Sequence, residues 1–388
     1  MRVALRILVL AQAVGCSTEV VELAIVDASV PDAGPAAPRD AGESPRARLI
    51  CPDTLVAGSG DTFRDAIPDS PLAIEASGAL SMSVYGAEFL EDRGFGFLLR
   101  RHTGPGASFA SASLEGVHIA GPMLARDGDA GFVVAHHVRS STWGELIQLN
   151  VFRAGERSER YIVTGQESPV WDVAYVDQTF VAAIGDPARP RLEQFGINGR
   201  PVGFGEAPIP SGAIDARLAQ RGGTLWLFTR SAATANVVVG HRLIDGEIAT
   251  SVPFDACDAL LGWDVTTNGD DAFVALSCAD GGYLMATTRT EPRSLGAQTM
   301  TPRIAFDGAV IGVVGWAPDE TRPNVRFAAP DLSTIGAPFT VPLPVAVDEP
   351  GAVDIAGLEP GEGWAIAATS RKGDGWVQYF DGCVLEVQ

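Results

Sequence analysis

The sequence predicts an all-β fold, and three observations favour a seven-bladed β-propeller built from irregular four-stranded blades. From about Leu49 onward helix signals are nearly absent, and short β-rich runs alternate with Gly, Pro and Asp turns. One kind of apolar strand returns seven times along this region. Its mean spacing is about 44 residues, and a period of 40–50 residues with four short strands per unit is typical of propeller blades.

The recurring strands are expected at residues 94–102, 131–138, 179–184, 224–230, 272–278, 309–316 and 363–370. Their anchor residues are Phe97, Phe132, Phe180, Trp226, Phe273, Ile311 and Trp364. Because these runs are almost continuously apolar, we expect each strand to be buried on both faces between neighbouring blades. A pair of β-sandwich domains is the alternative, since irregular repeats also arise in other antiparallel sheet proteins.

The first fifteen residues have the pattern of a secretory signal peptide. Arg2 and Arg6 precede a short apolar run that ends in small residues. The run AVGC at positions 13–16 resembles the lipobox of bacterial lipoproteins. The resemblance implies cleavage after Gly15, lipidation of Cys16 and, with Ser17 next, a place in the outer membrane. Ordinary signal cleavage that leaves Cys16 unmodified is the alternative.

A spacer follows the predicted lipidation site. The run PDAGPAAPRDAGESP, from Pro31 to Pro45, has no aromatic or large aliphatic residue to bury, so we expect a flexible, partly polyproline tether. Tethers of this composition resemble those of surface lipoproteins. The expected organisation is a signal peptide at 1–15, a disordered tether at 16–47 and a propeller domain at 48–388.

The cysteine count fits an exported protein. Of the five cysteines, lipidation of Cys16 would leave four, which allow three pairings. No Cys/His spacing suggests zinc, so two disulfides are expected outside the cytoplasm. Cys51 and Cys383 stand at the two ends of the folded region, and their bridge would close the ring. Cys257 and Cys278 would then pair within the fifth unit.

One recurring polar position is a candidate ligand site. Asp172, Asp215, Asp264 and Asp354 precede the anchor residue of their units by 8 to 11 positions. Equivalent positions in four blades would face a central channel, where the carboxylates form an acidic ring that binds a cation such as calcium or a basic ligand. Trp171 and Trp263 would lie beside the ring as stacking platforms for a sugar or another apolar ligand. Alternatively, each aspartate accepts backbone N–H bonds where the chain enters a blade.

Function is constrained more by exclusion than by motif. A formal net charge of −20 repels phosphate backbones, so nucleic acid is not an expected partner. There is no catalytic motif, no phosphate-binding loop and no metal-binding spacing, and the five histidines are interpreted as structural. We expect a non-catalytic binding or scaffold propeller, anchored at the cell surface by lipid alone, for protein or carbohydrate ligands. The alternative is a secreted hydrolase or lyase acting on polysaccharide or a small polar substrate.

Overall fold

The computed structural model describes strands and their connections in the region that follows the predicted tether. The described residues are 47–50, 56–57, 65–66, 72–77, 80–88, 93–101, 109–114, 117–127, 131–140, 144–153, 156–163, 170–186, 189–196, 200–296, 300–316, 322–341, 349–358, 364–372, 375–381 and 384–387. Chain contacts separate Met1–Glu43 from a second unit, Ser44–Gln388. The predicted signal peptide, Cys16, Cys51, Cys383 and nearly all of the tether lie outside the described residues.

The described strands of the second unit form seven sheets of four or five strands, and one sheet of two. Within each larger sheet all neighbouring strands are antiparallel. We number these sheets first to seventh by their innermost strands. The innermost strands are β4 (Leu72–Ser77), β8 (Val117–Asp127), β12 (Val170–Val176), β16 (Ala213–Arg221), β20 (Leu260–Thr267), β24 (Met300–Phe306) and β28 (Glu349–Gly357).

Three further strands complete each sheet. The second strands are β5 (Leu80–Glu88), β9 (Gly131–Ser140), β13 (Thr179–Ile184), β17 (Thr224–Ser231), β21 (Ala272–Cys278), β25 (Ile311–Trp316) and β29 (Trp364–Lys372). The third strands are β6 (Arg93–Arg101), β10 (Gly144–Arg153), β14 (Arg191–Gly196), β18 (Thr234–Ile244), β22 (Gly281–Ala286), β26 (Pro323–Ala328) and β30 (Gly375–Asp381). The outermost strands are β7 (Phe109–Leu114), β11 (Glu156–Val163), β15 (Pro201–Pro208), β19 (Glu247–Phe254), β23 (Arg289–Gly296), β27 (Thr334–Thr340) and β2 (Val56–Ala57).

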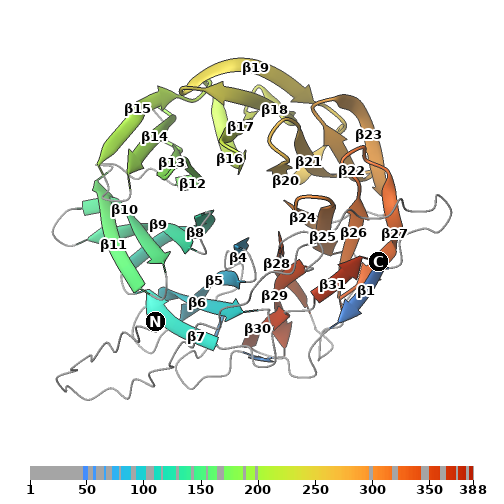
Figure 1. Cartoon of the computed structure of the whole chain (residues 1–388), viewed down its shortest axis with the longest axis horizontal. Helices are drawn as coiled ribbons and strands as arrows, with labels where there is room; N and C mark the ends of the chain where they lie inside the picture. The colour runs from blue at the N-terminus through green and yellow to red at the C-terminus, as the bar shows by residue number, and fades with distance from the viewer. Residues whose placement is uncertain are drawn as a thin grey trace, which may run out of the picture. The chain divides into compact units, whose positions relative to one another are not determined.

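The sheets stand around a common axis. Each innermost strand contacts the innermost strand of the next sheet, and β28 of the seventh sheet contacts β4 of the first. Figure 1 shows this arrangement, with the chain passing from sheet to sheet around the ring. The all-β propeller class predicted from the sequence is therefore confirmed, and the alternative of two β-sandwich domains is wrong.

The hydrophobic core lies between neighbouring sheets rather than at the axis. One cluster joins the fourth and fifth sheets through Phe228 and Val274, and another joins the sixth and seventh through Val314 and Ile366. Every residue of β21 and β25 is buried. These second strands pack on both faces, which explains their nearly continuous apolar sequences. The burial expected for the recurring strands is confirmed for the described side chains.

The first of the seven recurring strands occupies a different place in its sheet from the other six. The run at 94–102 forms β6, the third strand, whereas the other six runs coincide with second strands. The second strand of the first sheet is β5, whose sequence LSMSVYGAE alternates small and large residues. Because β5 lacks a continuous apolar run, the apolar repeat of the sequence falls on β6, one strand further out. The interval from the anchor Phe97 to the next anchor, Phe132, is therefore shorter than the mean spacing.

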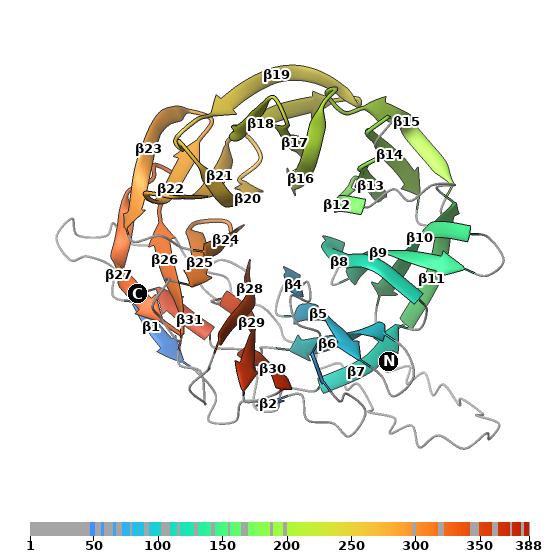
Figure 2. The same ribbon diagram turned by 180° about the vertical axis from the view of Figure 1, so that it is seen from behind.

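Strands from the two ends of the second unit lie together. β2 pairs with β30 as the outermost strand of the seventh sheet (Figure 2), so a strand from the start of the domain completes the last sheet. Next to it, β1 (Ala47–Ile50) pairs with β31 (Val384–Val387), and Ile50 lies opposite Val384. An additional short strand, β3 (Asp65–Ala66), pairs with β5. The chain is thus tied at both ends by backbone hydrogen bonds.

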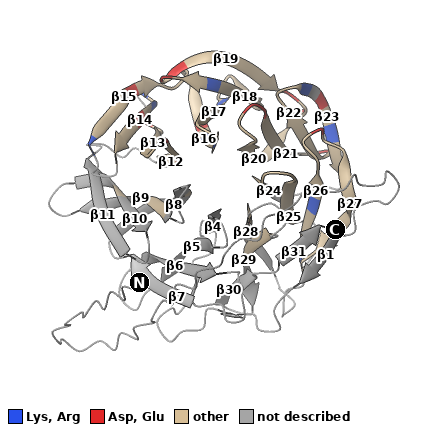
Figure 3. Ribbon diagram, in the orientation of Figure 1, with Lys and Arg blue, Asp and Glu red and all other residues tan. Residues whose placement is uncertain are grey.

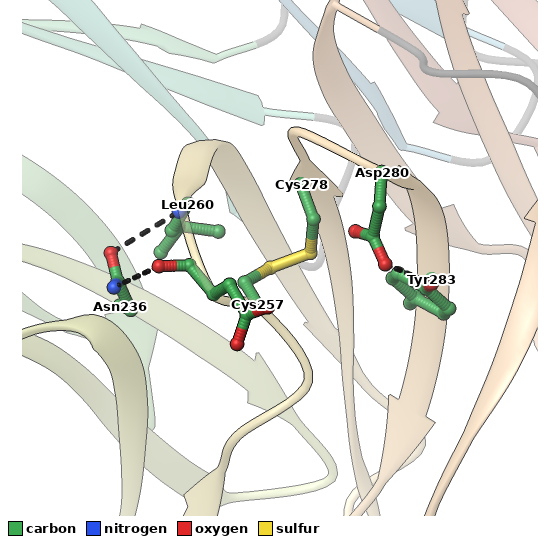
Figure 4. Close-up of a disulfide and its surroundings, with 7 residues drawn as sticks. Asn236, Cys257, Leu260, Cys278, Asp280 and Tyr283 are labelled. Carbon is green, nitrogen blue, oxygen red and sulfur yellow. Dashed lines mark hydrogen bonds between the residues drawn. A yellow bond between two sulfur atoms is a disulfide. The ribbon is translucent and has the colours of Figure 1, made fainter.

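A disulfide joins Cys257 and Cys278, as the sequence predicted for the fifth unit. Cys257 lies in the segment that enters the fifth sheet, and Cys278 ends β21, with 5.3 Å between their Cα atoms. Asn236 of the fourth sheet fixes the same segment, because its Oδ1 accepts the N–H of Leu260 at 3.2 Å (Figure 4). The bridge therefore holds the connection between two sheets. In the described part of the chain, no helix has the length and apolar character needed to cross a membrane.

Candidate functional site

The four predicted aspartates all lie on innermost strands. Asp172 is on β12, Asp215 on β16, Asp264 on β20 and Asp354 on β28. All four therefore belong to the innermost layer of strands, whereas their equivalence depends on where each residue lies along its strand.

Two of these carboxylates connect neighbouring sheets. Oδ2 of Asp172 accepts the backbone N–H of Leu218 in the fourth sheet at 2.7 Å. Oδ2 of Asp264 accepts the N–H of Ile304 in the sixth sheet at 3.0 Å. Each aspartate thus satisfies a backbone donor of the next innermost strand along the ring. The interpretation that these residues accept backbone N–H bonds is correct for both, although the donors lie in the adjacent sheet.

A second type of backbone contact is local. Oδ1 of Asp172 accepts the N–H of Val173 at 2.8 Å, and Oδ1 of Asp354 accepts the N–H of Ile355 at 2.9 Å. A register shift interrupts the pairing of β12 just before Asp172 and that of β28 just before Val353. Such bulges leave backbone groups without partners in the neighbouring strand. The two carboxylates accept hydrogen bonds from N–H groups beside these bulges.

Asp215 does not share the structural position of Asp172. The hairpins β12–β13 and β16–β17 both close through two-residue turns, with Val176 opposite Thr179 and Arg221 opposite Thr224. Asp172 lies four residues before Val176, the last paired residue of β12. The residue four positions before Arg221, the last paired residue of β16, is Arg217. The predicted equivalence was wrong here. Asp172 precedes Phe180 by 8 residues and Asp215 precedes Trp226 by 11, so a shared window before the anchor residue did not mean the same level along the ring axis.

Arginines therefore alternate with aspartates around the axis. Arg217 precedes Leu218, and Arg303 precedes Ile304. The two N–H groups that donate to the aspartates therefore each follow an arginine, which places Arg217 and Arg303 at equivalent positions. In order around the ring, the charged positions of the third to seventh sheets are Asp172, Arg217, Asp264, Arg303 and Asp354. In this order around the ring, each arginine stands between two carboxylates.

Arg303 is the point at which the negative charges converge. Its Nη1 lies 3.8 Å from Oδ1 of Asp264. Burial disfavours the charged guanidinium, but four carboxylates outweigh burial and raise the pKa of Arg303 above its ordinary value. These carboxylates belong to Asp264, Asp354, Asp172 and Asp215. From the sequence, we expected a cation or backbone N–H groups to offset the repulsion among these carboxylates. In the structure, arginine side chains and backbone N–H groups offset it.

Asp172 has the most perturbed carboxyl of this ring. Burial raises its pKa to about 6, and the Asp264 carboxylate contributes to the rise. The Arg217 guanidinium and the N–H groups of Leu218 and Val173 oppose this rise. In the part of the chain that the structure describes, no group of three or more His, Cys, Asp or Glu side chains is placed to hold a metal ion.

Trp263 does not form the open platform that the sequence suggested. It is buried between the fourth and fifth sheets, and the Arg217 guanidinium lies over its ring at 5.9 Å. The stacking role is therefore wrong for Trp263. Trp171 is half-buried and lies against Gly185, where an added Cβ would come within 2.3 Å of the Trp171 ring, and its stacking role stays a prediction.

Sequence reasoning missed the arginines of the ring. A signal for them exists, because each charged residue precedes a buried aliphatic one. The pairs are Asp172–Val173, Arg217–Leu218, Asp264–Val265, Arg303–Ile304 and Asp354–Ile355. A search for this charged–aliphatic pair, instead of for aspartate alone, would have placed Arg217 in the ring and Asp215 outside it.

His241 illustrates the structural role that we expected of the histidines. It is buried in β18, with Nε2 at 3.1 Å from the Thr229 hydroxyl and Nδ1 at 2.8 Å from the Ser251 hydroxyl. Burial lowers the pKa of His241, which favours a neutral ring that bonds three adjacent strands of the fourth sheet. The structural interpretation is confirmed for this residue.

A cleft between the third and fourth sheets is the second candidate site. We call it the inter-sheet cleft; its volume is about 540 Å³. It lies between the β12–β13, β16–β17 and β18–β19 turns and the strands β14, β15 and β18. The lining residues are Val176, Asp177, Val181, Gln194, Gly203, Phe204, Gly223, Thr224, Leu225, Arg242, Leu243, Ile244, Asp245 and Gly246. Basic and acidic residues both occur along the outer part of the fourth and fifth sheets, on β18, β19 and β23 (Figure 3).

Tight turns shape the inter-sheet cleft. Asp177 and Gln178 have φ values of 47° and 65°, and Asp245 and Gly246 have values of 52° and 79°. Positive φ at both central residues is the signature of the two-residue turn that fits the twist of antiparallel strands. These turns expose the side chains of Asp177 and Asp245 at the end of each hairpin. No sequence pattern predicts this site, because its residues come from separate turns of two sheets.

Comparisons with known proteins identify the fold only. No protein-family model and no curated protein sequence matches the chain. Among solved structures, the chain is similar to the β-propeller domain of the Trilobed protease from Pyrococcus furiosus. The TM-score is 0.52 at 9% identity, covering 84% of this chain and 96% of that one.

Two enzymes have lower scores. Aldose sugar dehydrogenase from Streptomyces coelicolor has a TM-score of 0.45 at 14% identity, covering 69% of this chain and 94% of that one. Trypanosoma rangeli sialidase has a TM-score of 0.45 at 9% identity, covering 87% and 60%. At 9% identity the likeness to the Pyrococcus furiosus domain extends to the propeller fold alone, a scaffold that hosts many unrelated functions.

Proposed function

We propose that this chain is a lipid-anchored envelope protein that displays a non-catalytic binding propeller for protein or carbohydrate ligands. The observation that carries the proposal is the use of the charged residues at the ring axis. Asp172 and Asp264 bond backbone donors of the next sheet, and Arg303 lies among four carboxylates. Side chains engaged in this way hold the sheets together, which leaves recognition to groups elsewhere on the domain.

The cellular location follows from the N-terminal sequence. Cys16 becomes the lipidated N-terminus of the mature protein, and the Asp/Ala/Pro-rich tether carries the propeller clear of the outer membrane. The disulfide between Cys257 and Cys278 supports an exported protein, since disulfides persist mainly in oxidising compartments.

Lipidation is tested by expressing the full chain in a Gram-negative host. The membrane fraction should contain protein whose intact mass equals residues 16–388 plus the lipid, and Cys16→Ala should move the protein to the soluble fraction. Ser17→Ala is the matched control and should stay in the membrane. Recovery of soluble, unmodified wild-type protein would refute the anchor.

An enzymatic role is the second candidate, and Asp172 favours it. A carboxyl with a pKa of about 6 lies in the range in which a group can serve as a general acid near neutral pH. The discriminating experiment incubates the full chain with purified surface polysaccharides and follows product masses. Release of fragments by wild-type protein, lost in Asp172→Asn, would establish a hydrolase or lyase, whereas polysaccharides that bind and are recovered intact support the binding role.

A further inference from the structure

We propose that the inter-sheet cleft binds an uncharged saccharide, and that Arg242 and Asp177 make the principal hydrogen bonds to it. The proposal rests on the binding function proposed above and names both its site and its ligand class. It starts from polar groups that the fold leaves unused.

Three charged side chains line the cleft without structural partners. Arg242, Asp177 and Asp245 make no side-chain hydrogen bond or ion pair with any other residue that the structure describes. Arg242 is half-buried on β18, where an unsatisfied guanidinium costs free energy unless solvent or a ligand accepts its N–H groups. By contrast, Arg191 on β14 has two ion-pair partners, Asp186 at 3.2 Å and Glu193 at 2.7 Å. The cleft therefore presents donors and acceptors that the propeller itself does not consume.

Glycines and one aromatic ring shape the walls. Phe204 of the third sheet lies against Gly246 of the fourth, where an added Cβ would come within 2.5 Å of the Phe204 ring. Gln194 lies over Gly203, where an added Cβ would come within 2.1 Å of the glutamine oxygen. Nε2 of Gln194 donates to the Thr179 hydroxyl at 2.8 Å, and its Oε1 accepts the N–H of Phe204 at 3.1 Å. The ordered glutamine and phenylalanine form a rigid wall, which reduces the entropy lost when a ligand binds.

The combination of groups selects the ligand class. A sugar hydroxyl both donates and accepts, so it can accept from Arg242 while a neighbouring hydroxyl donates to Asp177. The apolar side chains of Phe204, Val176 and Leu225 offer surface to the C–H face of a sugar ring. Two carboxylates against one guanidinium disfavour anionic ligands. An uncharged saccharide satisfies all three charged groups.

The size of the cleft agrees with this class. Its volume of about 540 Å³ falls within the roughly 300–1,000 Å³ that is typical of small-molecule sites. The mixed lining of a few polar groups among apolar side chains is also typical of such sites.

Binding is tested with the full chain, solubilised in detergent, on an array of uncharged and acidic glycans. The uncharged glycan that binds most strongly is then titrated calorimetrically. Arg242→Ala and Asp177→Asn should each weaken its affinity at least tenfold without lowering the melting temperature. Arg293→Ala and Glu247→Gln are matched controls on exposed positions outside the cleft, and both should bind as the wild type does.

Several outcomes would overturn the proposal. Binding of acidic glycans only, or of peptides but of no glycan, contradicts the ligand class. Wild-type affinity in both Arg242→Ala and Asp177→Asn contradicts the location. The proposed anchoring fails separately, if Cys16→Ala remains in the membrane, and the proposed binding role fails if glycans are cleaved. Absence of binding to every glycan overturns the saccharide while leaving a protein ligand for the propeller.

Discussion

Single residues at the ring axis join one sheet to the next. A carboxylate of one innermost strand accepts a backbone N–H of the following strand, and an arginine occupies the equivalent place in that strand. The sequence predicted the aspartates, since they recur before four of the seven anchor strands. The sequence did not predict the position of Asp215 correctly. Strand length and turn length together set the level of a residue along the ring axis, and the spacing between repeats reveals neither.

The first prediction concerns the pH dependence that Asp172 confers on stability. Its pKa rises from the ordinary 3.8 to about 6 in the folded protein, so between these values the folded state binds the proton more tightly. The contribution to stability is largest below about pH 4, falls as the pH rises to 6 and is constant above it. The total loss is at most about 3 kcal/mol, because one pKa unit corresponds to ~1.4 kcal/mol.

Urea denaturation of the wild type and Asp172→Asn at pH 4, 5, 6 and 7 measures this contribution. The variant should lack the decrease between pH 4 and 6 that Asp172 adds to the wild-type profile. Asp215→Asn is the control, and it should keep the wild-type profile in this window. Parallel profiles for Asp172→Asn and the wild type would show that Asp172 titrates normally.

At the scale of strands, the sequence signal is strong where both faces of a strand are buried and weak elsewhere. β21 and β25 are buried along their whole length and were found from their apolar runs alone. β5 has no such run, and β2 is two residues long, so neither carries a recognisable pattern. Closure by β2 is a long-range pairing, which no local sequence pattern encodes.

The second prediction concerns the disulfide that ties the entry segment of the fifth sheet to β21. The bridged cysteines are 21 residues apart, and in the chain-entropy model a loop of this size contributes about 3 kcal/mol. The double variant Cys257→Ala, Cys278→Ala should lose about this amount in urea denaturation. Wild-type protein in excess reductant should lose at least as much. An unchanged midpoint in the double variant would mean that the bridge constrains nothing.

At the scale of the whole molecule, closure of the ring depends on both ends of the domain. β2 completes the seventh sheet, and the β1–β31 ladder places Ile50 opposite Val384. In the sequence, Cys51 follows Ile50 and Cys383 precedes Val384. Both cysteines lie outside the described residues, so the bridge between them stays a prediction.

The third prediction is that non-reducing peptide mapping of the full chain recovers a peptide pair joined through Cys51 and Cys383. The pair joined through Cys257 and Cys278 should appear in the same digest and serves as the internal control. Recovery of Cys51 linked to Cys257 or Cys278 would contradict covalent closure of the ring.

The central claim is that the axis residues stabilise the ring while the inter-sheet cleft binds the ligand. The most direct test measures thermal stability and affinity for the uncharged glycan together in two arginine variants. Arg303→Met should lose about 1–3 kcal/mol of stability, because four carboxylates lose a partly exposed counter-charge, and should keep wild-type affinity. Arg242→Ala should keep its stability and lose at least tenfold in affinity. The reverse pattern, in which Arg303→Met abolishes binding and Arg242→Ala binds normally, would place the ligand at the axis and contradict the account.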